Sequence, residues 1–161
     1  ESNLLYQFAN DETIISEVRQ YFGINPVIKY ISVWADQPNN QVKDNIYTQK
    51  FHRDPDDNKL IKIFMYLNKV EENNGPFTYI KGSHKNPWVN FSGDEYDINK
   101  IYEVYGKESI CRLTGNEGTI IFADTNGLHC GQKLKHGKRY LVTVAYCSDK
   151  PRIPIQYPIL Q

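Results

Sequence analysis

The chain has 161 residues, a length that fits one domain with its own hydrophobic core. Its 19 Lys and Arg residues balance its 19 Asp and Glu residues, and the zero formal net charge argues against binding nucleic acid through a basic surface. No apolar run is long enough to span a bilayer, and residues 1–25 lack a signal-peptide pattern, so we expect a cytoplasmic protein without a membrane partner.

One amphipathic helix is predicted near the N-terminus. Asn10 or Asp11 can cap its start, and Gly23 followed by Pro26 marks its end. Between these positions, apolar residues recur at helical spacing: Ile14, Ile15, Val18 and Phe22.

From residue 27 onward the sequence favours β-structure. Segments rich in β-branched and aromatic residues alternate with turn clusters such as EENNG at 71–75. The predicted strands are 27–34, 46–51, 60–67, 76–81, 118–124 and 139–147. Short strands punctuated by turns predict a mainly β fold, an antiparallel sandwich or barrel, rather than βαβ units.

Residues 85–109 interrupt this pattern. They are polar and aromatic without a clear period, which is typical of either a functional lid or a surface excursion. Both interpretations stay open. The tail at 151–160 contains three prolines and is expected to run extended.

The segment KFHRDPDD, residues 50–57, contains the first candidate site. His52 precedes Asp54 by two positions at the end of a predicted strand, and residues with that spacing point to the same face of a strand. The pair can therefore bind a metal. The alternative is an acidic turn, because DPDDN at 54–58 has the composition that turns favour.

The segment DTNGLHCGQKLKHGKRYLVTVAY, residues 124–146, supplies a second histidine and an arginine. His129 follows the strand at 118–124, and Arg139 begins the next strand. Two histidines and one carboxylate form the ligand face of non-haem Fe(II) oxygenases, which leaves three metal positions open. The fork of an arginine binds a carboxylate. The dianion 2-oxoglutarate suits both groups, because it can chelate iron at one end and meet Arg139 at the other while one position remains for O₂.

Two stretches resemble the phytanoyl-CoA dioxygenase family of Fe(II)/2-oxoglutarate-dependent oxygenases. They are FHRDPDDNKLIKIFMYLNKVEENNGPFTYIKGSHK (51–85) and GTIIFADTNGLHCGQKLKHGKRYLVTVAY (118–146), and the resemblance covers roughly residues 27–147. It implies a double-stranded β-helix, a jelly-roll, cupin-like barrel with a few flanking helices. It also implies that His52, Asp54 and His129 bind iron and that Arg139 anchors 2-oxoglutarate.

The sequence departs from the family pattern in two ways. Members are usually longer, and the chain begins at Glu1 rather than Met, which leaves an N-terminal truncation open. Some members have Ser or Thr where this chain has Gly131, so a second contact to 2-oxoglutarate must come from elsewhere. Lys62, Phe64 and Tyr66 alternate on one strand face and are candidates for lining the pocket. The opposite face is expected in the core: Ile61, Ile63, Met65 and Leu67.

Several other polar residues have structural interpretations. His84 is expected to be a hydrogen-bonding residue at a strand end, and His136 a solvated turn residue. Asp124 either orients a metal ligand or caps the loop before His129. The three cysteines are unclustered, so we expect free thiols and no zinc site.

Together these features predict a single-domain dioxygenase over residues 1–161 that uses Fe(II), 2-oxoglutarate and O₂. It would hydroxylate a small organic substrate and release succinate and CO₂. Asp54 favours hydroxylation, because halogenases that resemble this scaffold have Gly or Ala at that position. The alternative is a non-catalytic, cupin-like metal- or ligand-binding module. The sequence indicates neither the substrate nor the oligomeric state.

Overall fold

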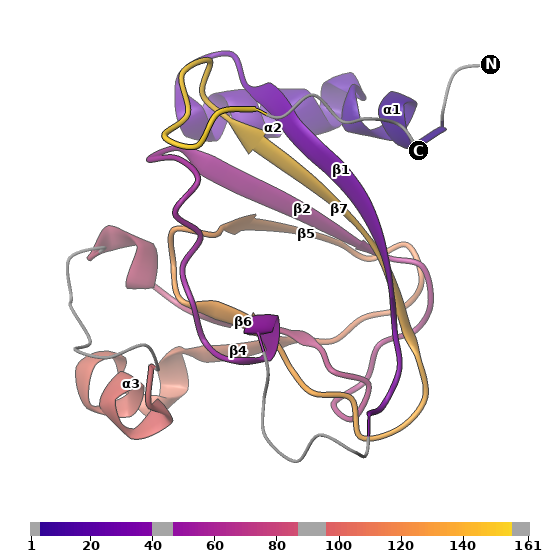
Figure 1. The fold of residues 1–161 in the computed structure, drawn as a ribbon, viewed down its shortest axis with the longest axis vertical. Coiled ribbons are helices and arrows are strands. Elements are labelled where there is room, and N and C mark those ends of the chain that lie inside the picture. The colour runs from indigo at the N-terminus through magenta and orange to yellow at the C-terminus, as the bar shows by residue number, and fades with distance from the viewer. Residues whose placement is uncertain (1–3, 40–46, 87–95, 156–161) are drawn as a thin grey trace.

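The computed structural model describes residues 4–39, 47–86 and 96–155 (Figure 1). Two antiparallel sheets face each other. The larger sheet has the order β1-β7-β2-β5, and the smaller has the order β4-β3-β6. The strands are β1 (Val27–Asp36), β2 (Leu60–Tyr66), β3 (Phe77–Ile80), β4 (Ile110–Leu113), β5 (Ile120–Asp124), β6 (His129–Gly131) and β7 (Arg139–Cys147).

A β-bridge between His52 and His129 extends the smaller sheet beyond β6. With this segment included, each sheet has four members, and the chain crosses repeatedly from one sheet to the other. This is a double-stranded β-helix, so the predicted fold class is confirmed.

The strand alternation separates two apolar layers. Phe64 and Tyr66 of β2 face the interior between the sheets, where they meet Phe77 and Leu141. Residues of the opposite phase pack outside the larger sheet against helix α2 (Glu12–Phe22), for example Ile61 and Ile63. The prediction that these two isoleucines belong to the core is therefore confirmed.

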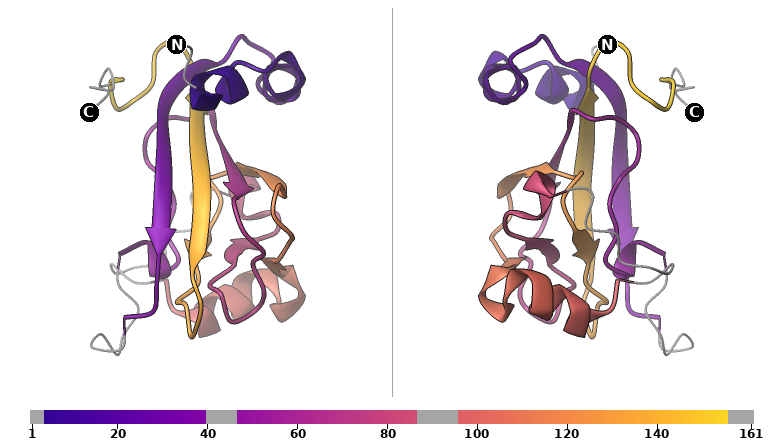
Figure 2. Two further views of the ribbon diagram at one scale, coloured as in Figure 1. Left: turned by 90° about the vertical axis from the view of Figure 1, so that its right-hand side faces the viewer. Right: turned by 90° about the vertical axis from the view of Figure 1, so that its left-hand side faces the viewer.

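Helix α2 begins and ends as its sequence predicts. The Asp11 carboxylate accepts a hydrogen bond from the Thr13 amide at 2.9 Å, and Gly23 ends the helix with φ of 66°, a conformation that favours glycine. The shorter helix α1 (Leu4–Ala9) was not predicted. Figure 2 shows α1 and α2 together at one end of the molecule and α3 (Ile98–Tyr105) at the opposite end. Within the described ranges, none of the helices combines the length and apolarity needed to cross a membrane.

Two expectations are corrected. Tyr47–Gln49 form a short 3₁₀ helix, η1, where a strand was predicted over 46–51; Ile46 lies outside the described residues. In the antiparallel register that pairs His52 with His129, residues 47–49 would lie opposite residues 132–134, beyond the end of the three-residue strand β6, so they lack a partner strand. Leu67, expected in the core, is 38% exposed because it follows the end of β2.

Residues 85–109, which show no clear period in the sequence, contain a helix. Asp97 caps helix α3, and Ile101 of that helix is fully buried against Ile80 and Leu128. Another 3₁₀ helix, η3 (Lys107–Ser109), leads into β4. Residues 87–95 lie outside the described residues, so the lid interpretation stays a prediction.

Candidate metal centre

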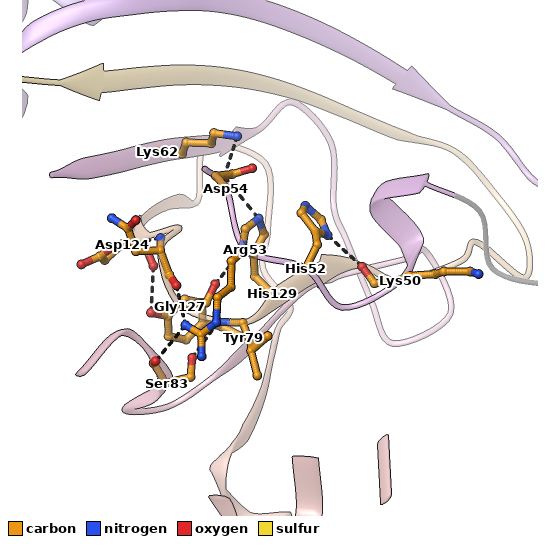
Figure 3. Close-up of polar contacts among 12 residues, drawn as sticks. Lys50, His52, Arg53, Asp54, Lys62, Tyr79, Ser83, Asp124, Gly127 and His129 are labelled. Atoms are coloured by element: carbon orange, nitrogen blue, oxygen red, sulfur yellow. Dashed lines mark hydrogen bonds and ion pairs between the residues drawn. The ribbon is translucent and has the colours of Figure 1, made fainter. Parts of the chain in front are cut away.

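His52 and His129 lie side by side on paired segments of the smaller sheet. Their backbones exchange two hydrogen bonds, His52 N–H to His129 O at 2.9 Å and His129 N–H to His52 O at 3.0 Å. The Asp54 amide donates to Thr125 O at 2.9 Å, which fixes the carboxylate beside the second histidine segment. The ligand atoms of His52, Asp54 and His129 all lie within 4.8 Å of one another (Figure 3).

Both imidazoles direct the same nitrogen into this site. Nδ1 of His52 lies 2.8 Å from Lys50 O, and Nδ1 of His129 lies 2.9 Å from Gly127 O. Because a carbonyl oxygen can only accept, each neutral ring has its proton on Nδ1 and its lone pair on Nε2. The two Nε2 atoms are therefore available to bind a metal. Partners that fix the tautomer in this way are typical of metal-binding histidines.

Asp54 is the candidate oxygen ligand. Its Oδ2 atom is buried, lies 2.7 Å from Lys62 Nζ and 3.5 Å from His129 Nε2, and has no well-aligned hydrogen bond within the described part of the chain. Burial would raise the pKa of Asp54, but the positive charges of His129, when protonated, and of Lys62, together with polar contacts to Lys62 and Thr125, outweigh burial and hold it below its ordinary value. The carboxylate is thus ionised at neutral pH.

His129 is neutral at the same pH. Its side chain is buried, and burial lowers its pKa from 6.5 to about 4 despite the nearby charge of Asp54. A neutral imidazole is the form that binds a metal. The centre therefore combines an ionised carboxylate with a histidine that is ready to bind a metal.

This donor set fits a divalent transition metal. In the described ranges, His52, Asp54 and His129 are the one group of three or more His, Cys, Asp or Glu side chains close enough to share an ion. The buried, poorly satisfied Asp54 Oδ2 atom gains a partner when a cation binds. Two imidazoles and one carboxylate suit Fe(II), and they leave coordination positions for other ligands.

A cavity of about 160 Å³ opens beside the two histidines in the barrel interior. Lys62, Phe64 and Arg139 all line it, at the positions where a 2-oxoglutarate pocket was expected. Further lining residues were not anticipated from the sequence: Tyr30, Trp34, Asp36, Thr48 and Thr143. The alternation of Trp34 and Asp36 along β1 is the signal that could have identified two of them.

Arg139 enters this cavity with part of its guanidinium already paired. Its Nε and Nη2 atoms donate to Asp36 Oδ2 at 3.1 and 2.8 Å, and Nη1 donates to Gly75 O. A guanidinium has five N–H groups. One N–H on each terminal nitrogen is therefore left for a ligand.

Gly131 allows the guanidinium to lie close to β6. A Cβ atom at this position would lie 3.2 Å from Arg139 Nη2, closer than ordinary contact. Glycine at this position therefore leaves room for the guanidinium beside β6. A side chain here would press on the arginine.

Asp124 and His84 are structural. Asp124 accepts hydrogen bonds from the Tyr21 hydroxyl at 2.6 Å and from the Asn126 amide at 3.0 Å, so it caps the loop before His129. His84 Nδ1 lies 3.3 Å from the Tyr79 hydroxyl. His136 is exposed, and the three cysteines are free.

Comparison with solved structures identifies the fold. No family model and no curated protein sequence matches the chain. Among solved structures it is similar to the epimerase SnoN in complex with Fe³⁺, alpha ketoglutarate and nogalamycin RO, with TM-score 0.73 and 16% identity over 99% of this chain and 67% of SnoN. EctD from S. alaskensis with bound Fe gives TM-score 0.71 and 18% identity over 98% of this chain and 58% of EctD.

A third similar structure is HygX from Streptomyces hygroscopicus with nickel and 2-oxoglutarate bound. Its TM-score is 0.61 at 15% identity, over 92% of this chain and 68% of HygX. The chain thus spans about three fifths to two thirds of the length of these proteins. At such low identities, the likeness establishes the shared barrel.

Proposed function

We propose that this chain is a non-haem Fe(II)- and 2-oxoglutarate-dependent dioxygenase that hydroxylates a small organic substrate. The observation that carries this proposal is the convergence of His52, Asp54 and His129 inside a double-stranded β-helix. Similar structures that contain iron or nickel, two of them together with alpha ketoglutarate or 2-oxoglutarate, support it. The order of motifs also supports membership of the phytanoyl-CoA dioxygenase family.

Three residues of the chain would hold the metal. His52 and His129 offer Nε2 because their Nδ1 atoms face carbonyl oxygens, and Asp54 offers its carboxylate. When bound, Fe(II) with 2-oxoglutarate and O₂ supplies the chemistry that inserts an oxygen atom into a C–H bond and releases succinate and CO₂. A metal at Asp54 Oδ2 replaces the Lys62 ammonium as the partner of that oxygen.

The cavity residues would bind 2-oxoglutarate. Arg139 offers the two remaining N–H groups of its terminal nitrogens, and Lys62, once released from Asp54, offers a second positive charge. Phe64 and Phe77, with ring centroids 4.4 Å apart, form an apolar wall that keeps water from the bound ligand. A small dicarboxylate is the ligand class that matches two cations in so small a cavity.

Analysis of the product distinguishes hydroxylation from other reactions that the same barrel supports. The same barrel occurs in a protein described as an epimerase, and one fold supports many reactions. Two similar structures contain nogalamycin RO or hygromycin B, so small organic molecules are the substrates to screen first.

The experiment is a screen of metabolite fractions with Fe(II), 2-oxoglutarate, ascorbate and O₂, with Asp54→Gly as the inactive control. We expect a fraction that stimulates succinate release by the wild type only, together with a product that has gained one oxygen atom. Succinate release with a product of unchanged mass would indicate that the chain catalyses an epimerisation and not a hydroxylation. Metal binding with no succinate from any fraction would favour the non-catalytic module.

A further inference from the structure

Arg53 stands between two of the candidate metal ligands in the sequence, but its side chain points the other way. Figure 3 shows the guanidinium directed away from the side chains of His52 and Asp54, toward the region of Gly127 and Ser83. The metal-site proposal gives this residue no role.

The guanidinium joins separate parts of the chain. Its Nη1 atom donates to Asn126 O at 2.5 Å and to Ser83 O at 2.9 Å. Its Nη2 atom lies 3.3 Å from the Tyr105 hydroxyl of α3 and 3.4 Å from Asn86 O. One side chain therefore connects the segment of His52 and Asp54 to the loop before His129, to the 3₁₀ helix η2 (Ser83–Lys85) and to α3.

The loop before His129 determines how that imidazole is oriented. Gly127 O is the partner of His129 Nδ1, and Gly127 directly follows Asn126, whose carbonyl Arg53 holds. On the other side, the Leu128 amide donates to the Ser83 hydroxyl at 2.7 Å. Arg53 and Ser83 thus hold the residues on both sides of the carbonyl that orients the ligand.

The chemistry of the contacts requires an arginine. Its partners in the described residues are carbonyl oxygens and a hydroxyl, and none of them has a negative charge. A planar fork can reach carbonyls of two segments at once, whereas the ammonium group of lysine lacks this fixed geometry.

We infer that Arg53 is a positioning residue for the metal centre, acting through Asn126 and Ser83 on the Gly127 carbonyl and hence on His129. The inference rests on the proposed metal site. It predicts that loss of the fork changes how the metal is bound, beyond any effect on stability.

The test uses Co(II) as an optical probe in the full chain, under anaerobic conditions, with near-UV circular dichroism to confirm folding. We expect Arg53→Lys and Arg53→Gln to weaken Co(II) affinity about ten- to a hundredfold, the usual effect of losing a group that orients a metal ligand. At saturating Co(II) the ligand-field spectrum should also change, because His129 approaches the metal differently. Ser83→Ala removes the hydroxyl that holds the Leu128 amide but keeps Arg53, and it should change the spectrum in the same way. This variant replaces the Arg53 variants as the test if they do not fold.

Two controls separate positioning from stability. Tyr105→Phe removes only the contact with α3, and Val18→Ala weakens the packing of the distant helix α2; both should leave the Co(II) affinity and spectrum unchanged. Equal effects in these controls, or Arg53 variants with the wild-type affinity and spectrum, would overturn the inference. If His52→Ala loses Co(II) in the same experiment while the Arg53 variants do not, the metal site stands and only the role of Arg53 falls. A wild type that binds no Co(II) would remove both.

Discussion

Lys62 occupies the position next to Asp54 that a metal ion would share. The ammonium nitrogen lies 2.7 Å from Asp54 Oδ2, and both side chains are nearly buried, at 13% and 11% exposed. Burial would lower the pKa of Lys62, but the charge of Asp54, the contribution of Tyr30 and the hydrogen bonds to both residues together outweigh burial and raise it. Without metal, the lysine is therefore the cation that balances the carboxylate.

Replacing this lysine should therefore strengthen metal binding while weakening the metal-free fold. In Lys62→Met the metal no longer competes with, or is repelled by, a neighbouring ammonium group, so we expect tighter Fe(II) binding. Loss of one partner of a buried ion pair should lower the free energy of unfolding of the metal-free protein by on the order of 3 kcal/mol. Anaerobic Fe(II) titration and urea unfolding measure the two effects, with the exposed Lys69→Met as control. Loss of Fe(II) binding in Lys62→Met would mean that the lysine supports the metal site instead of competing for it.

The buried imidazole of His129 should make the metal-free protein sensitive to acid. Its pKa is about 4 in the fold and about 6.5 when unfolded, so between these pH values the unfolded chain binds more protons. Its contribution to stability is therefore complete above pH 6.5 and is lost as the pH falls toward 4, with a total of about 3 kcal/mol at most. Urea unfolding in the presence of a chelator should show this slope in the wild type and a smaller one in His129→Asn. Identical slopes in the two proteins would contradict the assignment.

Arg139 should determine the affinity for 2-oxoglutarate and have little effect on the affinity for Fe(II). A hydrogen bond to a charged group contributes about 1.5–3 kcal/mol, so Arg139→Lys should weaken 2-oxoglutarate binding on the order of ten- to a hundredfold. The exposed Arg112→Lys on β4 is the matched control. Titration of 2-oxoglutarate into the Fe(II) protein without oxygen checks this, and unchanged affinity in Arg139→Lys would remove the anchor.

The loop leading into β6, together with β6 itself, connects the candidate metal site to the proposed 2-oxoglutarate pocket. At one end, a Cβ atom on Gly127 would lie 2.0 Å from the Tyr79 hydroxyl oxygen and 2.9 Å from the Ser83 hydroxyl oxygen, so the loop or these side chains must move. At the other end, a Cβ atom on Gly131 would press on Arg139. Gly127 therefore leaves room for the loop before His129, and Gly131 leaves room for the guanidinium of Arg139.

The two alanine variants should weaken the binding of different ligands. Gly127→Ala should lower the free energy of unfolding by about 1–3 kcal/mol and weaken Fe(II) binding, because the carbonyl that orients His129 is displaced. Gly131→Ala should keep Fe(II) affinity and weaken 2-oxoglutarate binding. Both affinities can be measured in one anaerobic titration series. If both variants lost the same affinity for Fe(II) and the same affinity for 2-oxoglutarate, the two glycines would not have these separate roles.

The individual strands show which parts of this arrangement the sequence could predict. The two-residue spacing of His52 and Asp54 and the alternation of Lys62 and Phe64 are local, and each put side chains on the face where the structure has them. The pairing of Asp36 with Arg139 depends on the register between β1 and β7, strands that lie far apart in the chain, and no short pattern encodes it.

Elements that depend on distant partners were predicted less well. The 3₁₀ helix η1 replaces a predicted strand because the partner strand is short, and α3 is stabilised by Ile101 packing on the smaller sheet. Its amphipathic pattern is only two turns long, which is too little to stand out among polar and aromatic neighbours.

At the scale of the whole molecule, both facing sheets contribute side chains to the cavity at the centre of the barrel. The larger sheet supplies Lys62 and Arg139, and the smaller supplies His52 and His129, so the cavity between them combines candidate metal ligands with two cations that can bind the proposed dicarboxylate. Helix α2 stabilises the outside of the larger sheet, and α3 packs against the smaller one.

Anaerobic addition of Fe(II) and then 2-oxoglutarate, followed by visible absorption, tests this arrangement most directly. We predict one Fe(II) per chain in the wild type and a metal-to-ligand charge-transfer band that develops only when 2-oxoglutarate is added. His52→Ala should retain its fold but lose most of the Fe(II) affinity and the band. Equal Fe(II) binding by His52→Ala and the wild type, or a wild-type protein that binds Fe(II) but develops no band with 2-oxoglutarate, would contradict the proposed centre.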